Sequence, residues 1–146
     1  MSSDMGCDYR SDGPYRDASY TMALYVENGA GNYMPRREDY LACIGFDVIE
    51  NGRVIKILQI QGAPKKSTEL SILKWERMLL SILTNWAKEN RFTEVRVIQA
   101  KDQRWYIRYS QDKDHTKRMF LHYDVTARRS GFYFKDKLGC YVTKLA

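Results

Sequence analysis

The chain has 146 residues, of which 44% are hydrophobic, 13% aromatic and 29% charged. This composition and length are typical of a single globular domain and exclude a disordered or fibrous chain. No apolar run is long enough to cross a bilayer, and residues 1–20 lack the basic start and apolar centre of a secretory signal. We therefore expect a cytoplasmic protein that has no membrane partner.

The residues that usually bind metals or form disulfides are scattered. Cys7, Cys43 and Cys140 include no CxxC pair, a spacing that indicates neither a disulfide framework nor a zinc site and fits a reducing compartment. His115 and His122 are seven residues apart, so they do not form a helical pair of metal ligands. We expect no metal cofactor.

The net charge of +6 comes from the last third of the chain, because residues 101–146 contain 11 Lys or Arg against 5 Asp or Glu. This segment is also rich in aromatic residues. Such a region can bind single-stranded nucleic acid by combining phosphate contacts with base stacking. The alternative is that the aromatic side chains belong to the core and the basic ones only solvate the surface.

The first half of the chain predicts strands. Residues 1–20 show no sustained apolar period and are expected to form a loosely ordered arm before a domain over residues 21–146. A first strand is expected over residues 20–26. Apolar runs over residues 40–49 and 54–60 flank Asn51-Gly52, a pair typical of a tight turn in which both residues have positive φ. These runs predict an antiparallel hairpin that is covered on both faces, since apolar residues occupy both.

A long helix is predicted over residues 68–89. Ser67 or Thr68 can cap its start, Glu69 complements the helix dipole, and Asn90 can end it in a left-handed conformation. Its buried face is expected to consist of Ile72, Trp75, Leu79, Ile82, Leu83 and Trp86. Residues 94–100 read as the next strand, and a strand, helix and strand in this order predict a parallel right-handed crossover.

The last third is less clear. Residues 101–114 are polar and aromatic and fit no regular element. Residues 116–130 fit either a strand or a helix, but the basic last turn followed by Gly131 is typical of a helix end. Residues 132–134 and 140–145 predict a final hairpin.

Most catalytic motifs are missing from the sequence. Ser110, Asp112 and His115 have the chemistry of a nucleophilic triad, but one polar loop gives them no rigid scaffold. Neither a Walker loop nor a GxGxxG motif is present, so the usual phosphate cradles of nucleotide hydrolysis and dinucleotide binding are lacking.

One junction has a physical rationale as a binding site. The strand that ends Leu58-Gln59-Ile60-Gln61 leads through Gly62, Lys65 and Lys66 to the start of the long helix. Free backbone amides and the positive end of the helix dipole attract anions there, and the two lysines add charge. A phosphate is one interpretation, and a plain connecting loop with solvating lysines is the other.

The order of these elements resembles the superfamily of Gcn5-related N-acetyltransferases (GNAT). The resemblance covers residues 40–145, and its most specific part is the segment Tyr123 to Phe132, similar to the family's last helix and its following Gly-Phe pair. It implies a single α/β domain with a mixed sheet, an N-terminal antiparallel hairpin and a strand-helix-strand crossover. It also implies that the pantetheine of acetyl-CoA lies in a splay between the strands at 54–60 and 94–100.

The resemblance further implies a function, the acyl-CoA-dependent transfer of an acetyl group to the amine of a small molecule or protein. It implies that backbone amides of the strand at 54–60 polarise the thioester oxygen. Tyr123, one turn before Ala127, would protonate the leaving thiolate, although a core tyrosine is the alternative role. The residues expected to bind the cofactor are Leu58, Gln59, Gln61, Gly62, Lys65 and Lys66.

A second function remains open from the sequence, that of a non-catalytic binding module on the same scaffold. Such a module would use the basic aromatic third of the chain to hold nucleic acid or an acidic protein. The residues expected to do so are Arg104, Trp105, Arg108, Arg128 and Arg129.

Overall fold

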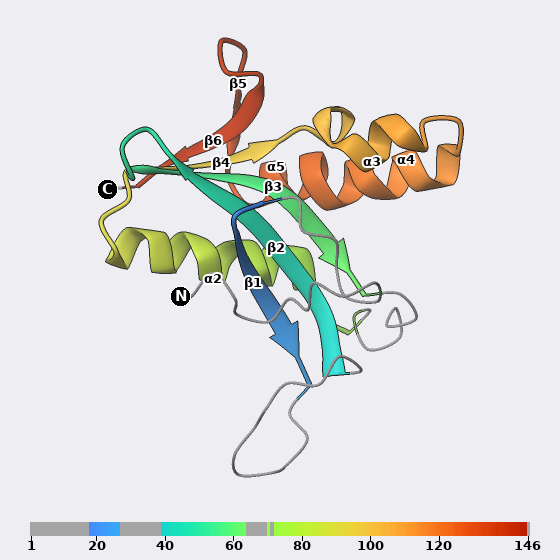
Figure 1. Cartoon of the computed structure of the whole chain (residues 1–146), viewed down its shortest axis with the longest axis horizontal. Coiled ribbons are helices and arrows are strands. Elements are labelled where there is room, and N and C mark those ends of the chain that lie inside the picture. The colour runs from blue at the N-terminus through green and yellow to red at the C-terminus, as the bar shows by residue number, and fades with distance from the viewer. Residues whose placement is uncertain (1–17, 27–38, 64–69, 71, 146) are drawn as a thin grey trace.

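A computed structural model describes residues 18–26, 39–63, 70 and 72–145 of the chain. It contains a six-stranded mixed sheet with the strand order β1-β2-β3-β4-β6-β5, so the predicted α/β class is confirmed (Figure 1). The predicted arm lies outside the described residues up to position 17. The strands are β1 (Tyr20–Tyr25), β2 (Tyr40–Ile49), β3 (Val54–Gly62), β4 (Glu94–Ile98), β5 (Tyr133–Lys135) and β6 (Cys140–Lys144).

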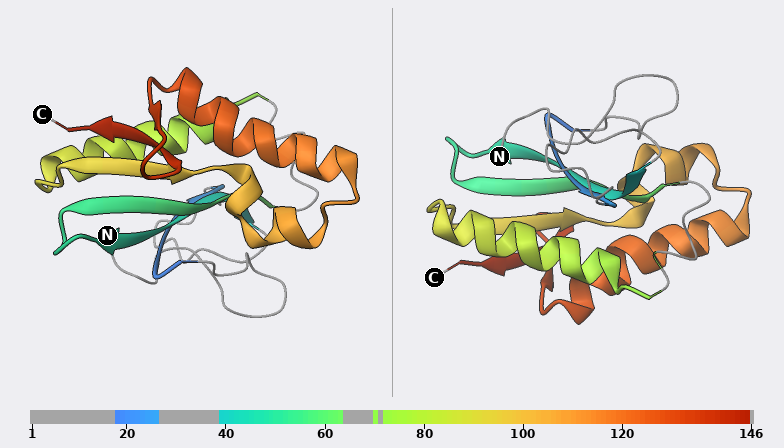
Figure 2. Two further views of the ribbon diagram at one scale, coloured as in Figure 1. Left: turned by 90° about the horizontal axis from the view of Figure 1, so that it is seen from above. Right: turned by 90° about the horizontal axis from the view of Figure 1, so that it is seen from below.

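The helices form a second layer beside the sheet. Figure 2 shows the longest helix and the C-terminal helical run on the same face of the sheet. In that run a π-helical segment joins two α-helices without a break. The helical elements are α2 (Trp75–Glu89), the 3₁₀ turn η2 (Ala100–Asp102), α3 (Arg104–Arg108), α4 (Lys113–Phe120), the π-helical η3 (Leu121–Val125) and α5 (Thr126–Arg129).

The predicted central hairpin is confirmed. β2 and β3 pair antiparallel, with Ile49 opposite Val54. The turn between them spans residues 50–53 and is therefore wider than the expected two residues. Three of its residues, Glu50, Asn51 and Gly52, have positive φ, at 51°, 57° and 79°. Every residue of β2 from Tyr40 to Phe46 is buried, which confirms that both faces of the hairpin are covered.

The other strands also follow the sequence pattern. β1 pairs antiparallel with β2, and β5 pairs antiparallel with β6 as the predicted final hairpin. The ambiguous residues 116–130 are helical, and the helix ends as predicted at Gly131, which has a φ of 85°. The N–H of Phe132 donates to the carbonyl of Ala127 at 3.0 Å and closes this end. The unassigned segment 101–114 contains α3 and the start of α4.

Helix α2 differs from the prediction at its start. It begins at Trp75, and Lys74 precedes it without a side-chain cap. The predicted caps Ser67 and Thr68, and also Glu69, lie outside the described residues. Two members of the predicted buried face are wrong, because Ile72 is 84% exposed and Ile82 is 47% exposed. The buried positions are Trp75, Leu79, Leu80, Leu83 and Ala87.

The end of α2 is also a correction. Asn90 has a φ of −97° and is not left-handed, whereas the next residue, Arg91, has a φ of 64°. Asn90 instead satisfies the end of the helix through its side chain, which donates from Nδ2 to the carbonyl of Trp86 at 2.8 Å. That bond holds Asn90 close to helical geometry, so the chain reverses one residue later.

The main core lies between the sheet and the helical layer. Side chains of β2, β3 and β4 on the helical face pack against α2, η3 and α5. Its central members are Ile44, Phe46, Ile55, Ile57, Leu79, Leu80, Leu83, Val95, Val97, Tyr123 and Tyr141. Within the part of the chain that the structure describes, none of the helices is both long and apolar enough to traverse a bilayer.

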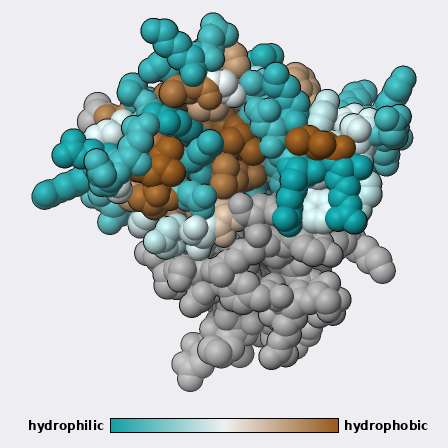
Figure 3. All heavy atoms as spheres, turned by 45° about the horizontal axis from the view of Figure 1, so that its top comes forward, coloured by the Kyte–Doolittle hydropathy of each residue, from teal (hydrophilic) through white to brown (hydrophobic). Residues whose placement is uncertain are grey.

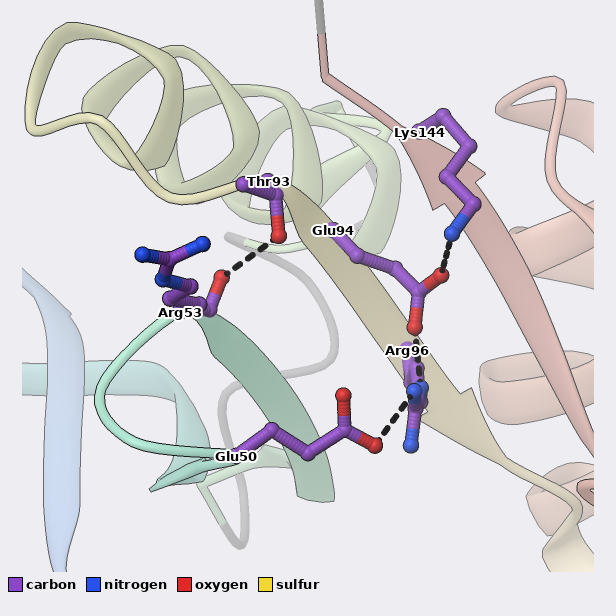
Figure 4. A network of polar contacts seen from close by, with 6 residues as sticks. All are labelled: Glu50, Arg53, Thr93, Glu94, Arg96 and Lys144. Atoms are coloured by element: carbon purple, nitrogen blue, oxygen red, sulfur yellow. Dashed lines mark hydrogen bonds and ion pairs between the residues drawn. The ribbon is translucent and has the colours of Figure 1, made fainter.

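A polar network lies where β4 begins, at the end of this strand opposite to η2 and α3. Figure 4 shows its residues. Glu94 is 2% exposed and binds both Arg96 and Lys144, the latter at 2.5 Å. Arg96 also bridges to Glu50 at 2.9 Å, which attaches the strained hairpin turn to β4. The two cations compensate the burial of the Glu94 carboxylate.

The parallel crossover is confirmed, but the pairing between its strands is short. β3 and β4 pair in parallel only from Val54 with Glu94 to Ile57 with Val97. β3 then continues to Gly62, while the chain after β4 turns away into η2 and α3. A register shift against β2 leaves Leu58 without a partner between Ile57 and Gln59, and this bulge bends β3 where it separates from β4.

Candidate functional site

A cavity of about 350 Å³ opens where β3 extends beyond its pairing with β4. One wall is the end of β3, residues 59–62, and the other walls come from α3, α4 and η3. None of the described residues that line it is acidic, so its charge favours a neutral or anionic ligand. The main side chains opposite β3 are Trp105, Tyr109, His115, Arg118, His122 and Tyr123.

The β3 wall presents two linked amides. Gln59 is 2% exposed, and its Nε2 donates to Oε1 of Gln61 at 2.7 Å. Gln59 has room because its neighbour on β2 is Gly45. A Cβ on Gly45 would lie 2.8 Å from Oε1 and 3.0 Å from Cβ of Gln59, closer than normal contacts allow. A side chain at position 45 would therefore displace Gln59.

Tyr123 lies on η3 at the back of the cavity and is 2% exposed. Its hydroxyl oxygen accepts the backbone N–H of Ile60 at 2.9 Å. The bond joins the helical wall to β3 directly at the point where the strands have parted. The Ile60 amide, one of the strand amides expected to polarise a thioester oxygen, is thus already engaged by Tyr123.

Asp124 anchors the π-helical segment to the sheet. It is 4% exposed and accepts the backbone N–H of Ala100 at 2.9 Å and the hydroxyl of Tyr141 at 2.8 Å. Burial and the hydrogen bond to this carboxylate raise the pKa of Tyr141 to about 12, so Tyr141 remains a donor at neutral pH. The anchor fixes the neighbouring side chains of η3 in the cavity wall.

His122, also on η3, is paired with a carboxylate of α2. Its Nδ1 lies 2.8 Å from Oε1 of Glu76, and its ring lies 5.3 Å from the ring of Trp75. The side chains of His122 and Glu76 are 30% and 22% exposed, so the pair is partly desolvated. Only His122 of this pair lines the cavity, and Glu76 contacts it from α2.

An aromatic group forms the outer wall. The rings of Trp105 and Tyr109 are stacked at 5.9 Å with an interplanar angle of 11°, and His115 meets Tyr109 edge-on at 5.4 Å. The guanidinium of Arg108 lies over both rings of the stack, at 5.2 Å and 5.7 Å. Arg104 lies 5.1 Å from the Trp105 ring. These cation–π contacts give the outer wall a positive surface.

The structure brings together four of the predicted site residues, namely Gln59, Gln61, Gly62 and Tyr123. Leu58 is not in the cavity wall and packs partly buried against the main core, so its place among the cofactor-binding residues is not supported. Lys65 and Lys66 lie outside the described residues.

Sequence reasoning missed the rest of the cavity wall. Gln103, Arg118, Met119 and His122 line the cavity, and three of them precede Tyr123 by short steps along one helical run. The helical reading of residues 116–130 had placed Met119, or Phe120, and Tyr123 on one face by their spacing, but it did not indicate that this face lines a cavity. The pairing of His122 with Glu76, 46 residues earlier, left no pattern in the sequence.

Among the described residues, no three His, Cys, Asp or Glu side chains come together as a group that would hold a metal ion. We also compared the chain with known proteins. No protein-family model, no curated protein and no solved structure gives a significant match. The α/β class and the cavity are therefore the findings from which a function is inferred.

Proposed function

We propose that this protein transfers an acetyl group from acetyl-CoA to an amine, on a scaffold of the Gcn5-related type. The observation that carries the proposal is the parting of two parallel strands, β3 and β4, after Ile57 and Val97, with a cavity in the opening. The resemblance in sequence implies that pantetheine occupies this place. A cavity of about 350 Å³ is within the range of small-ligand pockets.

Two further features support the proposal. The cavity wall contains three of the predicted cofactor-binding residues, Gln59, Gln61 and Gly62, together with Tyr123. The absence of acidic side chains from the described lining suits a cofactor that carries phosphates. The amides of Gln59 and Gln61 offer donors and acceptors of the kind that bind the amide groups of pantetheine.

In this reaction an amine attacks the thioester carbonyl and the CoA thiolate leaves. Binding both reactants in one cavity makes the attack effectively intramolecular. Tyr123 is the proposed donor of a proton to the thiolate. The Ile60 N–H that donates to its hydroxyl oxygen stabilises the phenolate left behind, because a hydrogen bond to the charged form favours that form.

The test is ligand binding measured by thermal shift and by calorimetry. A ligand that binds only the folded state at a hundredfold excess over its Kd stabilises that state by about 2.7 kcal/mol. Acetyl-CoA should therefore raise the melting temperature. Replacing Lys65 and Lys66 by Ala should reduce the shift, since these residues join β3 to α2 in the segment expected to meet the phosphates.

The matched control replaces Lys135 and Lys137 by Ala, which removes the same charge from the β5–β6 hairpin (Figure 1), none of whose residues is among the described lining of the cavity. This control should keep the full shift. A wild-type melting curve that does not change at millimolar acetyl-CoA would contradict the proposed function, and equal losses in both double variants would contradict the proposed phosphate contact.

The second candidate is the binding module for nucleic acid. One observation favours it, the stacked pair of Trp105 and Tyr109 with Arg104 and Arg108 at its faces. Aromatic stacking beside positive charge is how many proteins hold single strands. This candidate predicts a steep dependence of binding on salt.

A further inference from the structure

The cavity has a second group suited to proton transfer, the pair of His122 and Glu76. A carboxylate only accepts hydrogen bonds, so the short contact between Glu76 Oε1 and His122 Nδ1, 2.8 Å, requires the proton to be on Nδ1. In the neutral ring, Nε2 is then the nitrogen that has a free lone pair. The contact that the structure gives the His122 ring among the described polar side chains is the one from Nδ1 to Glu76, and none is given to Nε2.

The position of the ring is fixed from three sides. Glu76 holds Nδ1, the Trp75 ring packs against the imidazole at 5.3 Å, and the backbone of η3 carries His122 next to Tyr123. The bonds of Tyr123 to β3 and of Asp124 to Ala100 hold η3 itself. His122 is thus a preorganised base on the cavity wall rather than a mobile surface histidine.

Other charged and titratable groups face the same space. Arg118 on α4 and His115 also line the cavity, and both are basic residue types. Glu76 is therefore the carboxylate that balances a positive His122 in the part of the cavity that the structure describes. This charge pairing suits a group that takes up a proton and then releases it.

We infer that His122, oriented by Glu76, accepts the proton of the attacking amine through Nε2. The inference rests on the proposed function and names the base of that reaction. A bond forms between the amine nitrogen and the carbonyl carbon, and the bond from that carbon to sulfur breaks. One amine proton moves to Nε2, Tyr123 gives its proton to the thiolate, and solvent returns a proton from His122 to Tyr123.

The first experiment reads the tautomer and needs no substrate. The chain contains two histidines, so ¹⁵N-labelled histidine gives two ring systems in the NMR spectrum, and His115→Gln assigns them. Neutral His122 should be protonated at Nδ1, the tautomer that free imidazole rings disfavour. Glu76→Gln should weaken this preference, whereas Glu89→Gln, a matched change at the exposed end of α2, should keep it. An Nε2–H tautomer in the wild type would overturn the inference.

The second experiment measures acetyl transfer to an amine as a function of pH. His122→Gln should lower kcat/KM by about 100-fold or more and abolish the limb of the profile that depends on a free base, while the thermal shift by acetyl-CoA persists. Glu76→Gln should act in the same direction by a smaller factor, because it only positions the ring. An unchanged pH limb in His122→Gln would overturn the inference.

The two experiments separate this inference from the function on which it rests. A wild-type protein that binds no acetyl-CoA and transfers no acetyl group would refute the proposed function. The tautomer measurement on the free protein would then still decide whether Glu76 orients His122. Acetyl transfer with an Nε2–H tautomer would keep the proposed function and remove His122 as its base.

Discussion

The hydroxyl of Tyr123 and the backbone N–H of Ile60 form a 2.9 Å hydrogen bond between residues 63 positions apart. The bond spans the opening between β3 and the helical layer, where a parallel neighbour strand would otherwise pair with Ile60. Tyr123 thus satisfies a buried strand amide that the parting of β3 and β4 leaves without a ladder partner. The same contact places the phenol at the back of the cavity.

Replacing Tyr123 by Phe should separate binding from chemistry. The variant leaves the Ile60 N–H buried without its partner, so the free energy of unfolding should fall by about 1–3 kcal/mol. If Tyr123 is the acid, turnover should fall sharply while the acetyl-CoA thermal shift persists. Steady-state kinetics and thermal shift on the same preparation check this, and full turnover in Tyr123→Phe would leave Tyr123 as a core residue only.

Replacing Gly45 by Ala should disturb the cavity from the opposite face of the sheet. The new methyl group would overlap Gln59, so the free energy of unfolding should fall by about 1–3 kcal/mol and the acetyl-CoA shift should decrease. Gln59→Ala removes Oε1, the nearer of the two atoms that the methyl group would meet, and keeps Cβ. The double variant should therefore lose less than the sum of the single variants, as measured by denaturant unfolding. Strict additivity would show that Gly45 and Gln59 do not interact.

The Glu94 network predicts a loss of stability in acid. Burial opposes ionisation of Glu94, but the hydrogen bonds from Lys144 and Arg96 outweigh it and hold the pKa of Glu94 below its usual value of 4.5. A carboxyl whose pKa is lower in the folded state contributes stability above the unfolded pKa, and that contribution is lost as the pH falls through the folded pKa. Figure 4 shows the contacts responsible.

Glu94→Gln should therefore lower the free energy of unfolding at pH 7 by about 2 kcal/mol and flatten its decline between about pH 5 and pH 3. Urea unfolding across this pH range is the measurement. Glu50→Gln is the matched control, since its carboxylate binds the same Arg96 but is 55% exposed, and its loss should stay below about 1 kcal/mol. A pH slope in Glu94→Gln equal to that of the wild type would contradict the network's role.

The nucleic-acid candidate makes a prediction of its own. If the stacked wall binds single strands, the affinity should fall steeply with salt, and reversing Arg104 and Arg108 to Glu should weaken it for all sequences alike. Reversing Lys135 and Lys137 to Glu changes the charge by the same amount in the β5–β6 hairpin, outside the stacked wall, and should have a smaller effect. Titration of labelled single-stranded RNA and DNA at low salt decides, and no binding there would remove this candidate.

Among the described residues, the exposed apolar side chains lie on several separate parts of the chain. Figure 3 shows them on one side of the molecule as separate patches among hydrophilic residues. Ile72, Ile107 and Leu121 are each about half exposed or more, at 84%, 62% and 48%, and lie before α2, in α3 and in η3. Scattered apolar residues of this kind are normal on a soluble surface.

The sequence predicted the elements whose signals are local. Asn51-Gly52 indicated the hairpin and Gly131 the end of the last helix, because positive φ is a property of single residues. Ile82 was assigned to the buried face of α2 because helical spacing does not determine how wide the buried stripe is, and Ile72 was assigned to it because the sequence predicted too early a start for the helix. Residues 59–62, four of the twelve described residues that line the cavity, were predictable because they are contiguous, whereas the contact between His122 and Glu76 depends on tertiary packing.

The π-helical segment η3 contains one more residue per turn than an α-helix does. At its end, the Thr126 hydroxyl donates a hydrogen bond to the carbonyl of Leu121 at 3.0 Å. Because of the extra residue, three consecutive side chains reach three separate parts of the fold: His122 reaches α2, Tyr123 reaches β3, and Asp124 reaches β6 and the chain after β4. Removing one of these three residues would restore α-helical geometry and delete at least one of the three contacts. The extra residue therefore lets a single helical turn join the cavity wall to α2, β3 and β6 at once.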